Sequence, residues 1–422
     1  MHESLLAVLR CPFCGTHLSP VENQALVRHA GRIGSGVLGC ECCAFPVVDG
    51  IPVLMADDVA RGAIVALEAG RPADARDLLL GLDEVRRAAF RALLARGGDV
   101  TYRALIEVLS PDAEGTYFIY RFSDPTYVMA EGTLRALAQD PRTTARWVVD
   151  VCGGSGHLTR GLTALQRDNP SSVGGTVLAD VYYWKLWLAS RITAPACHPV
   201  CCDANHPLPF SRDTCSMAVL SDAYPYLWHK RLLADELMRL VGPTGVVVMP
   251  HLHSALGENV SPGMPLTPAA YADLFAPMSP RLFRDEDLLA PLLEHETLDL
   301  SRPVTPDDMG SAPSLTLVAS REASLFRAYR VPAGAEVTGR LVVNPLYRMA
   351  REGGRTRLTL AFPTLEYAEE FGGCRRYLPD TLEVAADLTG ALDGRRLDAA
   401  LGPDYLRLLR RRVLIDAPPG YC

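Results

Sequence analysis

The sequence predicts an α/β protein built around a doubly wound, mostly parallel sheet, and three observations support this prediction. Between residues 147 and 249, short apolar runs alternate with helix-length segments. Strands separated by helices form crossover units with parallel neighbours, and ligands then bind at the carboxyl ends of the strands. Paired cysteines and a helical stretch precede this region, and a strand-rich stretch follows it.

The composition indicates a folded protein of more than one domain. The 422 residues are 48% hydrophobic and 22% charged, which is typical of globular chains. The net charge of −7 argues against a nucleic acid as the main ligand, because nucleic-acid-binding proteins usually carry a basic face. The chain has neither an apolar stretch of about 18 residues nor a basic-then-apolar start. We therefore expect a cytoplasmic protein with no membrane contact.

Shifts in pattern divide the chain into four expected regions. Residues 1–56 hold five cysteines among short strands and turns, and residues 57–135 form a helical lid or linker. Residues 136–255 form the doubly wound core, and residues 256–422 form an α+β region on the substrate side. Within this last region, EVTGRLVV, RTRLTLAFP and DTLEVAADL predict strands, whereas the text before residue 330 predicts proline-rich loops and helices.

A glycine-rich turn follows the first strand of the core. The strand Trp147–Val151 ends in Asp150-Val151, and Gly153, Gly154 and Gly156 then precede a helix. Glycine lets the backbone approach a ligand closely, and a helix N-terminus favours negative charge. Enzymes that use NAD have a similar turn. The carboxylate of Asp150, however, would repel a pyrophosphate and suits a cationic amino-acid moiety.

Two more acids end the next two strands. Asp180 comes about 24 residues after the turn, where an acid can bind both hydroxyls of a ribose, and Asp203 ends the third strand. A single aspartate at a strand end is a common turn residue or helix cap. Three in succession indicate a nucleoside site.

With these residues in place, the stretch from 148 to about 253 resembles class I S-adenosylmethionine (SAM)-dependent methyltransferases, which implies a Rossmann-like fold. DVCGGSG resembles their first motif, with Cys152 where the first glycine usually stands. SMAVLSDAYPYL resembles the fourth motif, and LVGPTGVVVMP resembles the turn and strand that follow. The resemblance implies that Asp150 holds the methionine amino group, that Asp180 holds the ribose and that Asp203 contacts the adenine. The implied cofactor contacts are Asp150, Gly153, Gly154, Gly156, Asp180, Asp203, Ala204, Ser221 and Asp222, with Tyr120 and Arg121 in a lid segment.

The cysteines near the start are spaced like metal ligands. CPFC supplies Cys11 and Cys14, and GCECC supplies Cys40, Cys42 and Cys43. Two such turns form a tetrahedral thiolate site for a structural zinc, which replaces the core that a short module lacks. The surrounding text resembles the Trm112-like and UPF0434-like zinc ribbons. The second turn is shorter than usual there, so either Cys42 or Cys43 is the fourth ligand and the other is spare.

Candidate catalytic residues follow the fourth and fifth strands. His251 and His253 in MPHLHS lie where a general base is needed, and their other interpretation is as capping or packing residues. Tyr224 is a candidate at the same edge, where it and Tyr226 either line a pocket or donate protons. No Asn/Asp-Pro-Pro-aromatic sequence follows the fourth strand, which disfavours amino-group methylation of bases.

These observations lead to three functional hypotheses. The first is a SAM-dependent methyltransferase acting on a small organic acceptor, such as a natural-product biosynthetic intermediate, at carbon or oxygen. The second is an rRNA or tRNA methyltransferase whose zinc ribbon recognises RNA. The third is a module that binds SAM without catalysis. An acidic chain with aromatic and histidine residues at the cleft favours the small acceptor.

Overall fold

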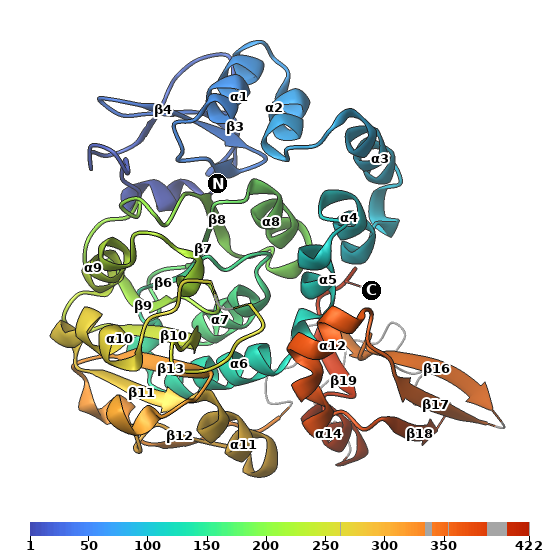
Figure 1. The fold of residues 1–422 in the computed structure, drawn as a ribbon. Helices are drawn as coiled ribbons and strands as arrows, with labels where there is room; N and C mark the ends of the chain where they lie inside the picture. The colour runs from blue at the N-terminus through green and yellow to red at the C-terminus, as the bar shows by residue number, and fades with distance from the viewer. Residues whose placement is uncertain (262, 334–339, 353, 386–402, 422) are drawn as a thin grey trace.

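The computed structural model describes all residues except 262, 334–339, 353, 386–402 and 422. The first residues of the predicted strand EVTGRLVV and the last of DTLEVAADL lie outside the described residues. Figure 1 shows a central α/β unit with a small strand-rich unit at the N-terminal end and a separate C-terminal group of strands and helices on its flank. No helix in the described part of the chain is long and apolar enough to span a bilayer.

The N-terminal unit is an antiparallel sheet that covers one edge of the main sheet. Its strands are β1 (Ser19–Pro20), β2 (Val27–His29), β3 (Arg32–Gly39), β4 (Ala44–Val48) and β5 (Ile51–Pro52). Just after β5, Val53 bridges Cys201 in parallel, and the Leu54 amide donates to the Cys201 carbonyl at 2.7 Å. Because Cys201 ends the outermost strand of the main sheet, the N-terminal unit covers an edge of that sheet that would otherwise be open.

Six helices fill the stretch between the small unit and the main sheet, as the periodicity predicts. They are α1 (Asp58–Glu68), α2 (Pro72–Leu79), α3 (Glu84–Leu94), α4 (Tyr102–Leu109), α5 (Ala113–Tyr120) and α6 (Pro125–Leu137). Most begin at an oxygen-bearing cap; Asp112 and Asp124 accept from the amides three residues later and so start α5 and α6. These two caps set the direction of the helices that cover the carboxyl ends of the central strands.

The main sheet has seven strands in the order β11-β13-β10-β9-β6-β7-β8. They are β6 (Trp147–Val151), β7 (Thr176–Asp180), β8 (His198–Cys201), β9 (Cys215–Val219), β10 (Val246–His253), β11 (Pro280–Arg284) and β13 (Ser314–Ala319). Strands β8, β7, β6, β9 and β10 are mutually parallel, and β13 runs antiparallel to both of its neighbours. The chain winds to one side after β6 and to the other from β9, which opens a ligand crevice where the order reverses. The sheet is therefore the doubly wound one that the sequence predicts.

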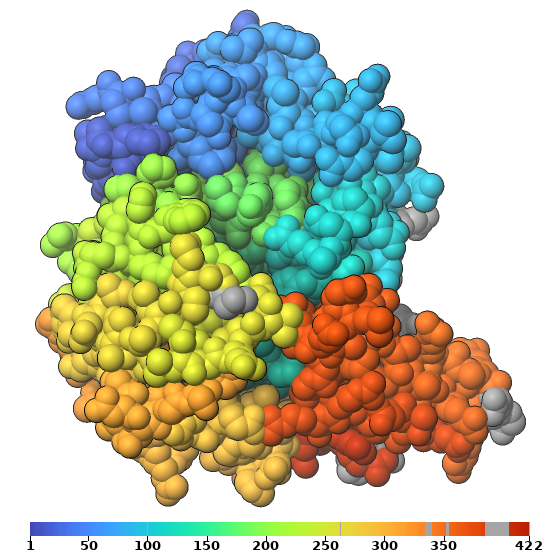
Figure 2. Space-filling view, viewed as in Figure 1, coloured from blue at the N-terminus to red at the C-terminus, as the bar shows by residue number. Residues whose placement is uncertain are grey.

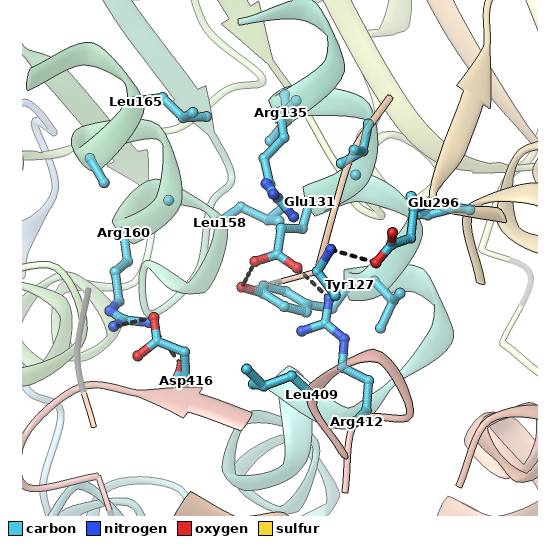
Figure 3. A pocket seen from close by; sticks show the side chains of 18 of the residues that line it. Tyr127, Glu131, Arg135, Leu158, Arg160, Leu165, Glu296, Leu409, Arg412 and Asp416 are labelled. Atoms are coloured by element: carbon cyan, nitrogen blue, oxygen red, sulfur yellow. Dashed lines mark hydrogen bonds and ion pairs between the residues drawn. The ribbon is translucent and has the colours of Figure 1, made fainter. Parts of the chain in front are cut away.

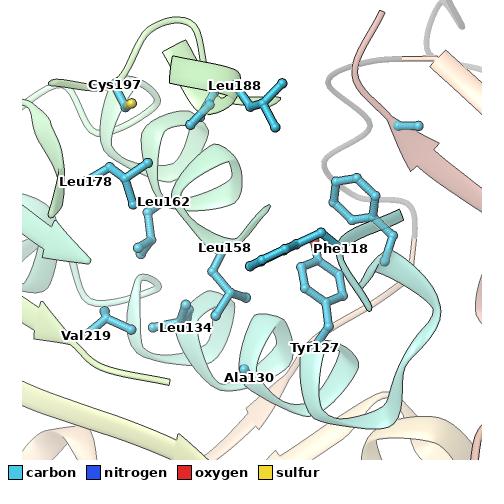
Figure 4. Packing of buried hydrophobic residues seen from close by; sticks show 14 of the residues in the cluster. Phe118, Tyr127, Ala130, Leu134, Leu158, Leu162, Leu178, Leu188, Cys197 and Val219 are labelled. Carbon is cyan, nitrogen blue, oxygen red and sulfur yellow. The ribbon is translucent and has the colours of Figure 1, made fainter. Parts of the chain in front are cut away.

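Three helices join the parallel strands, and two follow them. They are α7 (His157–Arg167), α8 (Tyr183–Leu188), α9 (Lys230–Val241), α10 (Pro268–Leu274) and α11 (Asp285–His295). Beneath the sheet, α6 and α7 pack together over an apolar layer in which Leu134, Leu158, Leu162 and Leu178 meet (Figure 4). This layer holds the start of α7 rigidly under the glycine turn.

The expected boundary at residue 255 divides strands that belong to one sheet. Strands β11 and β13 come from residues that the sequence predicts as loops and helices, yet β13 pairs with β10 along Val247–His253. Their short length and their flanking proline and serine residues hide them from a periodicity argument. Strand β13 is buried from Leu315 to Ala319, and β11 follows it at the edge of the sheet.

The C-terminal region is built mainly of short antiparallel pairs. Its elements are β12 (Thr297–Asp299), β14 (Ala328–Arg330), β15 (Arg340–Val343), β16 (Tyr347–Glu352), β17 (Arg355–Leu360), α12 (Leu365–Phe371), β18 (Thr381–Ala385), α14 (Pro403–Arg410) and β19 (Leu414–Ala417). In Figure 2 its orange and red surface stands against the yellow surface of the core across a recess. Ion pairs fix it to α6 and α7: Arg160 contacts Asp416 at 2.9 Å, and Arg412 contacts Glu131 (Figure 3).

Candidate active site

A cavity of about 590 Å³ lies at the carboxyl ends of the central strands. Its floor comes from the turns after β6, β7, β8 and β9, and α5 and α12 form further walls. The predicted cofactor residues that line it are Arg121, Asp150, Gly153, Gly154, Asp180, Asp203, Ala204, Ser221 and Asp222. The structure therefore brings nine predicted residues, from five separate segments, into one space.

Asp150 is the most unusual carboxylate in this cavity. The residue is fully buried, and its Oδ2 accepts from the Thr159 hydroxyl at 2.6 Å, while Oδ1 has no hydrogen-bond partner. Burial, and next the charge of Asp180, raise the pKa of Asp150 from 3.8 to about 7. A buried acceptor without a donor costs free energy, so the site is prepared for a ligand that donates.

The glycine turn leaves no room for side chains. A Cβ on Gly153 would lie 2.6 Å from Asp150 Oδ2, and one on Gly154, at a φ of +58°, would lie 2.8 Å from the Phe118 ring. Gly156 does not line the cavity; at a φ of 81° it caps α7. Cys152 stands in the same turn at a φ of 56°, a conformation that strains a residue with a Cβ. The turn is thus shaped for close approach of a ligand to the backbone.

The two other predicted strand-end acids are held in place by backbone amides. Asp180 accepts from Gly154 at 3.0 Å and from Tyr182 at 2.9 Å, which joins the end of β7 to the glycine turn. Asp203 accepts from the Asn205 amide at 2.8 Å. Both carboxylates face the cavity. Ser221 adds a second buried oxygen, Oγ, that has no partner.

A second group of titratable side chains forms beside Asp222. One side-chain nitrogen each of His251 and His253 and one carboxylate oxygen of Asp222 lie within 4.8 Å of one another. Asp222 Oδ1 lies 3.7 Å from His253 Nε2. A β-bulge between Met249 and Leu252 directs His251 toward this point. Only Asp222 of the three lines the cavity, so the imidazoles stand behind it.

The sequence did not indicate the partner of His251. His251 Nδ1 donates to Asp285 Oδ2 at 2.8 Å, and Thr316 donates to the other oxygen of Asp285 at 2.7 Å. The hydrogen bond to Asp285 and the charge of Asp222 outweigh burial and raise the pKa of His251 to about 9. His251 therefore carries a positive charge at neutral pH and lies between two carboxylates.

Of the two candidate tyrosines, one points away from the cavity. Tyr224 is buried beside Tyr271 and Phe275 and donates to the Lys230 carbonyl at 2.6 Å. Residues two apart in a short 3₁₀ turn face different directions. Tyr226, not Tyr224, consequently reaches the cavity.

Of the two predicted lid residues, only Arg121 lines the cavity. Tyr120 contacts Tyr367, with ring centroids 5.5 Å apart, and lies under the Arg103 guanidinium. Tyr117 and Phe118 of α5 and Arg121 directly after it line the cavity, whereas Tyr120 does not. Arg121 does line the cavity, but its charge is paired with buried Asp124 at 2.7 Å.

Several lining residues carry no sequence signal. Glu370 and Phe371 come from α12, in the region whose role the sequence does not reveal, and Tyr117 donates to Asp222 Oδ2 at 3.3 Å. Lys185 is paired with Glu114 at 2.7 Å. The C-terminal region thus contributes to the wall of the cavity.

The N-terminal cysteines meet in a second site. Cys11, Cys14, Cys40 and Cys42 bring their sulfurs together, and the Cys11–Cys42, Cys14–Cys40 and Cys40–Cys42 pairs are each 3.7 Å apart. Cys43 lies next to this group, with its amide donating to Cys40 Sγ at 3.2 Å. Of the two alternatives, Cys42 is the one whose sulfur lies within 4.8 Å of the other three, and Cys43 Sγ lies 3.3 Å from Cys42 Sγ.

The chain matches no family model and no curated protein. Among solved structures it is similar to a SAM-dependent methyltransferase from Aquifex aeolicus, at 13% identity and a TM-score of 0.34 over 48% of this chain and 97% of that one. It is also similar to the complex between the Haloferax volcanii Trm112 methyltransferase activator and a putative methyltransferase, at 19% identity and a TM-score of 0.35 over 49% of this chain and 93% of that one. A geranyl diphosphate C-methyltransferase from Streptomyces coelicolor gives 14% identity and a TM-score of 0.29 over 42% of this chain and 69% of that one. Because these identities and TM-scores are low, the functional conclusions rest on the residues that line this chain's own cavity.

Proposed function

We propose that this protein is a SAM-dependent methyltransferase that modifies a small organic acceptor at carbon or oxygen. The observation that supports it best is the partnerless Oδ1 of buried Asp150, placed above a glycine turn at the crossover of the sheet. A cationic amino group that donates to this oxygen would satisfy it. The methionine end of SAM carries such a group.

The other cavity residues fit the rest of this cofactor. Asp180 would accept from the ribose hydroxyls, and Asp203 with Ala204 would hold the base. The glycine turn offers a close backbone approach with no Cβ in the way. When bound, SAM supplies a methyl group on a positively charged sulfur, so the protein has mainly to position the acceptor and remove its proton.

The group around Asp222 is suited to proton removal. His251 cannot accept a proton at neutral pH because its pKa lies at about 9. The base therefore becomes Asp222 with His253, whose Nε2 lies 3.7 Å from the Asp222 carboxylate. His251 acts as a positive neighbour of Asp222, and Tyr117 orients the same carboxylate through its hydroxyl.

The cavity is less suited to RNA. Its lining includes six carboxylates, Glu114, Asp150, Asp180, Asp203, Asp222 and Glu370. Phosphate groups would be repelled there, because the two lining cations, Arg121 and Lys185, are already in ion pairs. A SAM-binding module without catalysis would have no use for a charged group beside the cofactor.

We also propose that the four sulfurs hold a structural zinc. At a Zn–S distance of about 2.3 Å, a tetrahedral site separates its sulfurs by roughly 3.8 Å, close to the 3.7 Å found between three of the pairs. All four positions are taken by thiolates, which would leave none for a substrate. The metal would stabilise a unit whose own core is small.

Titration calorimetry of the full chain with S-adenosylhomocysteine tests the proposal. We expect saturable binding of one molecule per chain and much weaker binding after Asp150→Asn. Absence of binding to the wild-type protein would overturn the assignment. Radiolabelled methyl transfer from SAM to pools of small hydroxylated compounds, compared with total RNA, then separates the acceptor classes.

A further inference from the structure

We propose that the acceptor carries a positively charged group, an ammonium or guanidinium, which Glu370 holds near Asp222 and against the rings of Tyr117 and Phe371. This inference rests on the proposed methyltransferase function and names the chemistry of its second substrate. Four described residues of the cavity carry it, and two of them belong to the C-terminal region.

The charges that line the cavity do not balance. Lys185 is matched by Glu114, and Arg121 is matched by Asp124 from outside the cavity. His157 also lines the cavity, but burial lowers its pKa well below the usual value, so it adds no charge. Three of the remaining carboxylates, at positions 150, 180 and 203, are assigned to the cofactor. Asp222 and Glu370 are left.

Among the described residues, His251 is a further cation near the cavity, but it does not remove this excess of negative charge. His251 lies between Asp222 and Asp285, so a single positive charge serves two carboxylates. Glu370 forms no ion pair within the described residues. Partial burial and repulsion from Asp222 and Asp124 raise the pKa of Glu370. A positive ligand group would relieve this repulsion, whereas an anionic ligand would increase it.

Aromatic rings surround the unbalanced carboxylates. The Tyr117 and Phe371 ring centroids are 5.4 Å apart, and Tyr226 also lines the cavity, with its hydroxyl tied to the Ser261 carbonyl at 2.6 Å. Ring faces attract cations within about 6 Å, and carboxylates beside them complete a site for an organic cation. Because α12 supplies both Glu370 and Phe371, the C-terminal region would select the substrate.

The positive group is a means of recognition and not the methylated atom. A protonated amine has no lone pair to offer the sulfonium methyl, so a different atom of the acceptor must react. The Asp222–His253 pair would accept the proton from a hydroxyl or an acidic carbon while Glu370 holds the charged end. This arrangement agrees with methylation at carbon or oxygen.

Three small probes of equal ring size test the proposal. The full-length protein is first saturated with S-adenosylhomocysteine, and tyramine, neutral tyrosol and anionic 3-(4-hydroxyphenyl)propanoate are then titrated by calorimetry. We expect saturable binding of tyramine, weaker binding of tyrosol and none of the propanoate. Higher salt should weaken tyramine binding.

Two neighbouring glutamates provide the matched variants. Glu370→Gln should weaken tyramine binding about fivefold, as expected for one partly exposed charge pair. Glu369→Gln should leave it unchanged, because Glu369 is exposed and does not line the cavity. The proposal is overturned if the propanoate binds as tightly as tyramine, if tyramine does not bind the loaded protein, or if both variants behave alike. Failure of the first titration, with S-adenosylhomocysteine, would instead overturn the proposed function.

Discussion

Replacing Asp150 by Asn should stabilise the ligand-free protein against unfolding and weaken its binding of S-adenosylhomocysteine. The buried carboxyl keeps its proton up to about pH 7, whereas in the unfolded chain it ionises near 3.8. Between these pH values the unfolded state binds fewer protons than the folded state, so the free energy of unfolding falls as the pH rises. The whole of this decrease is reached above pH 7. A shift of three units corresponds to up to about 4 kcal/mol. Asn keeps the shape and the contact with Thr159 but cannot ionise, so its Tm should exceed the wild-type value at pH 8 and match it near pH 4.

Binding should respond to pH in the opposite direction. A cationic amino group selects the ionised carboxylate, of which about a tenth is present at pH 6 and about nine tenths at pH 8 for a pKa near 7. The affinity for S-adenosylhomocysteine should therefore rise about tenfold between these pH values, with nearly one proton released at pH 6. The Asn variant should lose this dependence and bind about ten- to a hundredfold more weakly, the value of a charged hydrogen bond.

Calorimetry in two buffers of different ionisation enthalpy measures the released proton directly. Asp168→Asn is the matched control, because Asp168 is exposed at the far end of α7. The reasoning fails if wild-type affinity is flat between pH 6 and 8, or if the Asn variant retains the same slope. An Asn variant that melts lower than wild type at pH 8 would show that the carboxylate has a structural partner.

Three further outcomes are expected. Cys42→Ser should reduce bound zinc well below one per chain by metal analysis, whereas Cys43→Ser should keep it, because the Cys43 sulfur contacts Cys42 Sγ at 3.3 Å but is not among the four sulfurs that lie together; equal losses would reject the ligand choice. The raised pKa of His251 gives stability that is fully present below pH 6.5 and is lost as pH rises through about 9, so the Tm of the wild type should fall over this range and that of His251→Gln should not. Gly154→Ala should weaken S-adenosylhomocysteine binding at least tenfold, because its Cβ would lie 2.8 Å from Phe118. Gly161→Ala, on open helix surface, should bind normally and be more stable by about 1 kcal/mol; similar binding losses in the two variants would show that the turn is not the site.

The half of the cavity that we propose for the cofactor could be predicted from the sequence because its residues are local. Asp150 and the glycine turn lie within seven positions, and each acid marks the end of a strand that its own apolar run identifies. The acceptor half could not be predicted in this way. Glu370 comes from a region that ion pairs such as Arg160–Asp416 fix to the core, and such a long-range contact leaves no pattern in the sequence. Likewise, Asp285 begins a helix like many acids, and only the bulge in β10 brings His251 to it.

Three residues near the cavity have a strained backbone, and the reason differs between them. Cys152, Asp222 and His251 all have φ values between 56° and 59°, and they stand at the ends of three strands that lie close together in the sheet. Such a conformation costs about 1–2 kcal/mol for a residue with a Cβ, and glycine would avoid the cost. A turn that only reverses the chain gains nothing from a carboxylate or an imidazole. At Asp222 and His251 the strain is therefore best explained by the side chains, which meet beside the cavity. Cys152 has no such partner there, so glycine at this position should preserve binding of S-adenosylhomocysteine while removing strain, whereas glycine at 222 should remove the carboxylate of the proposed base.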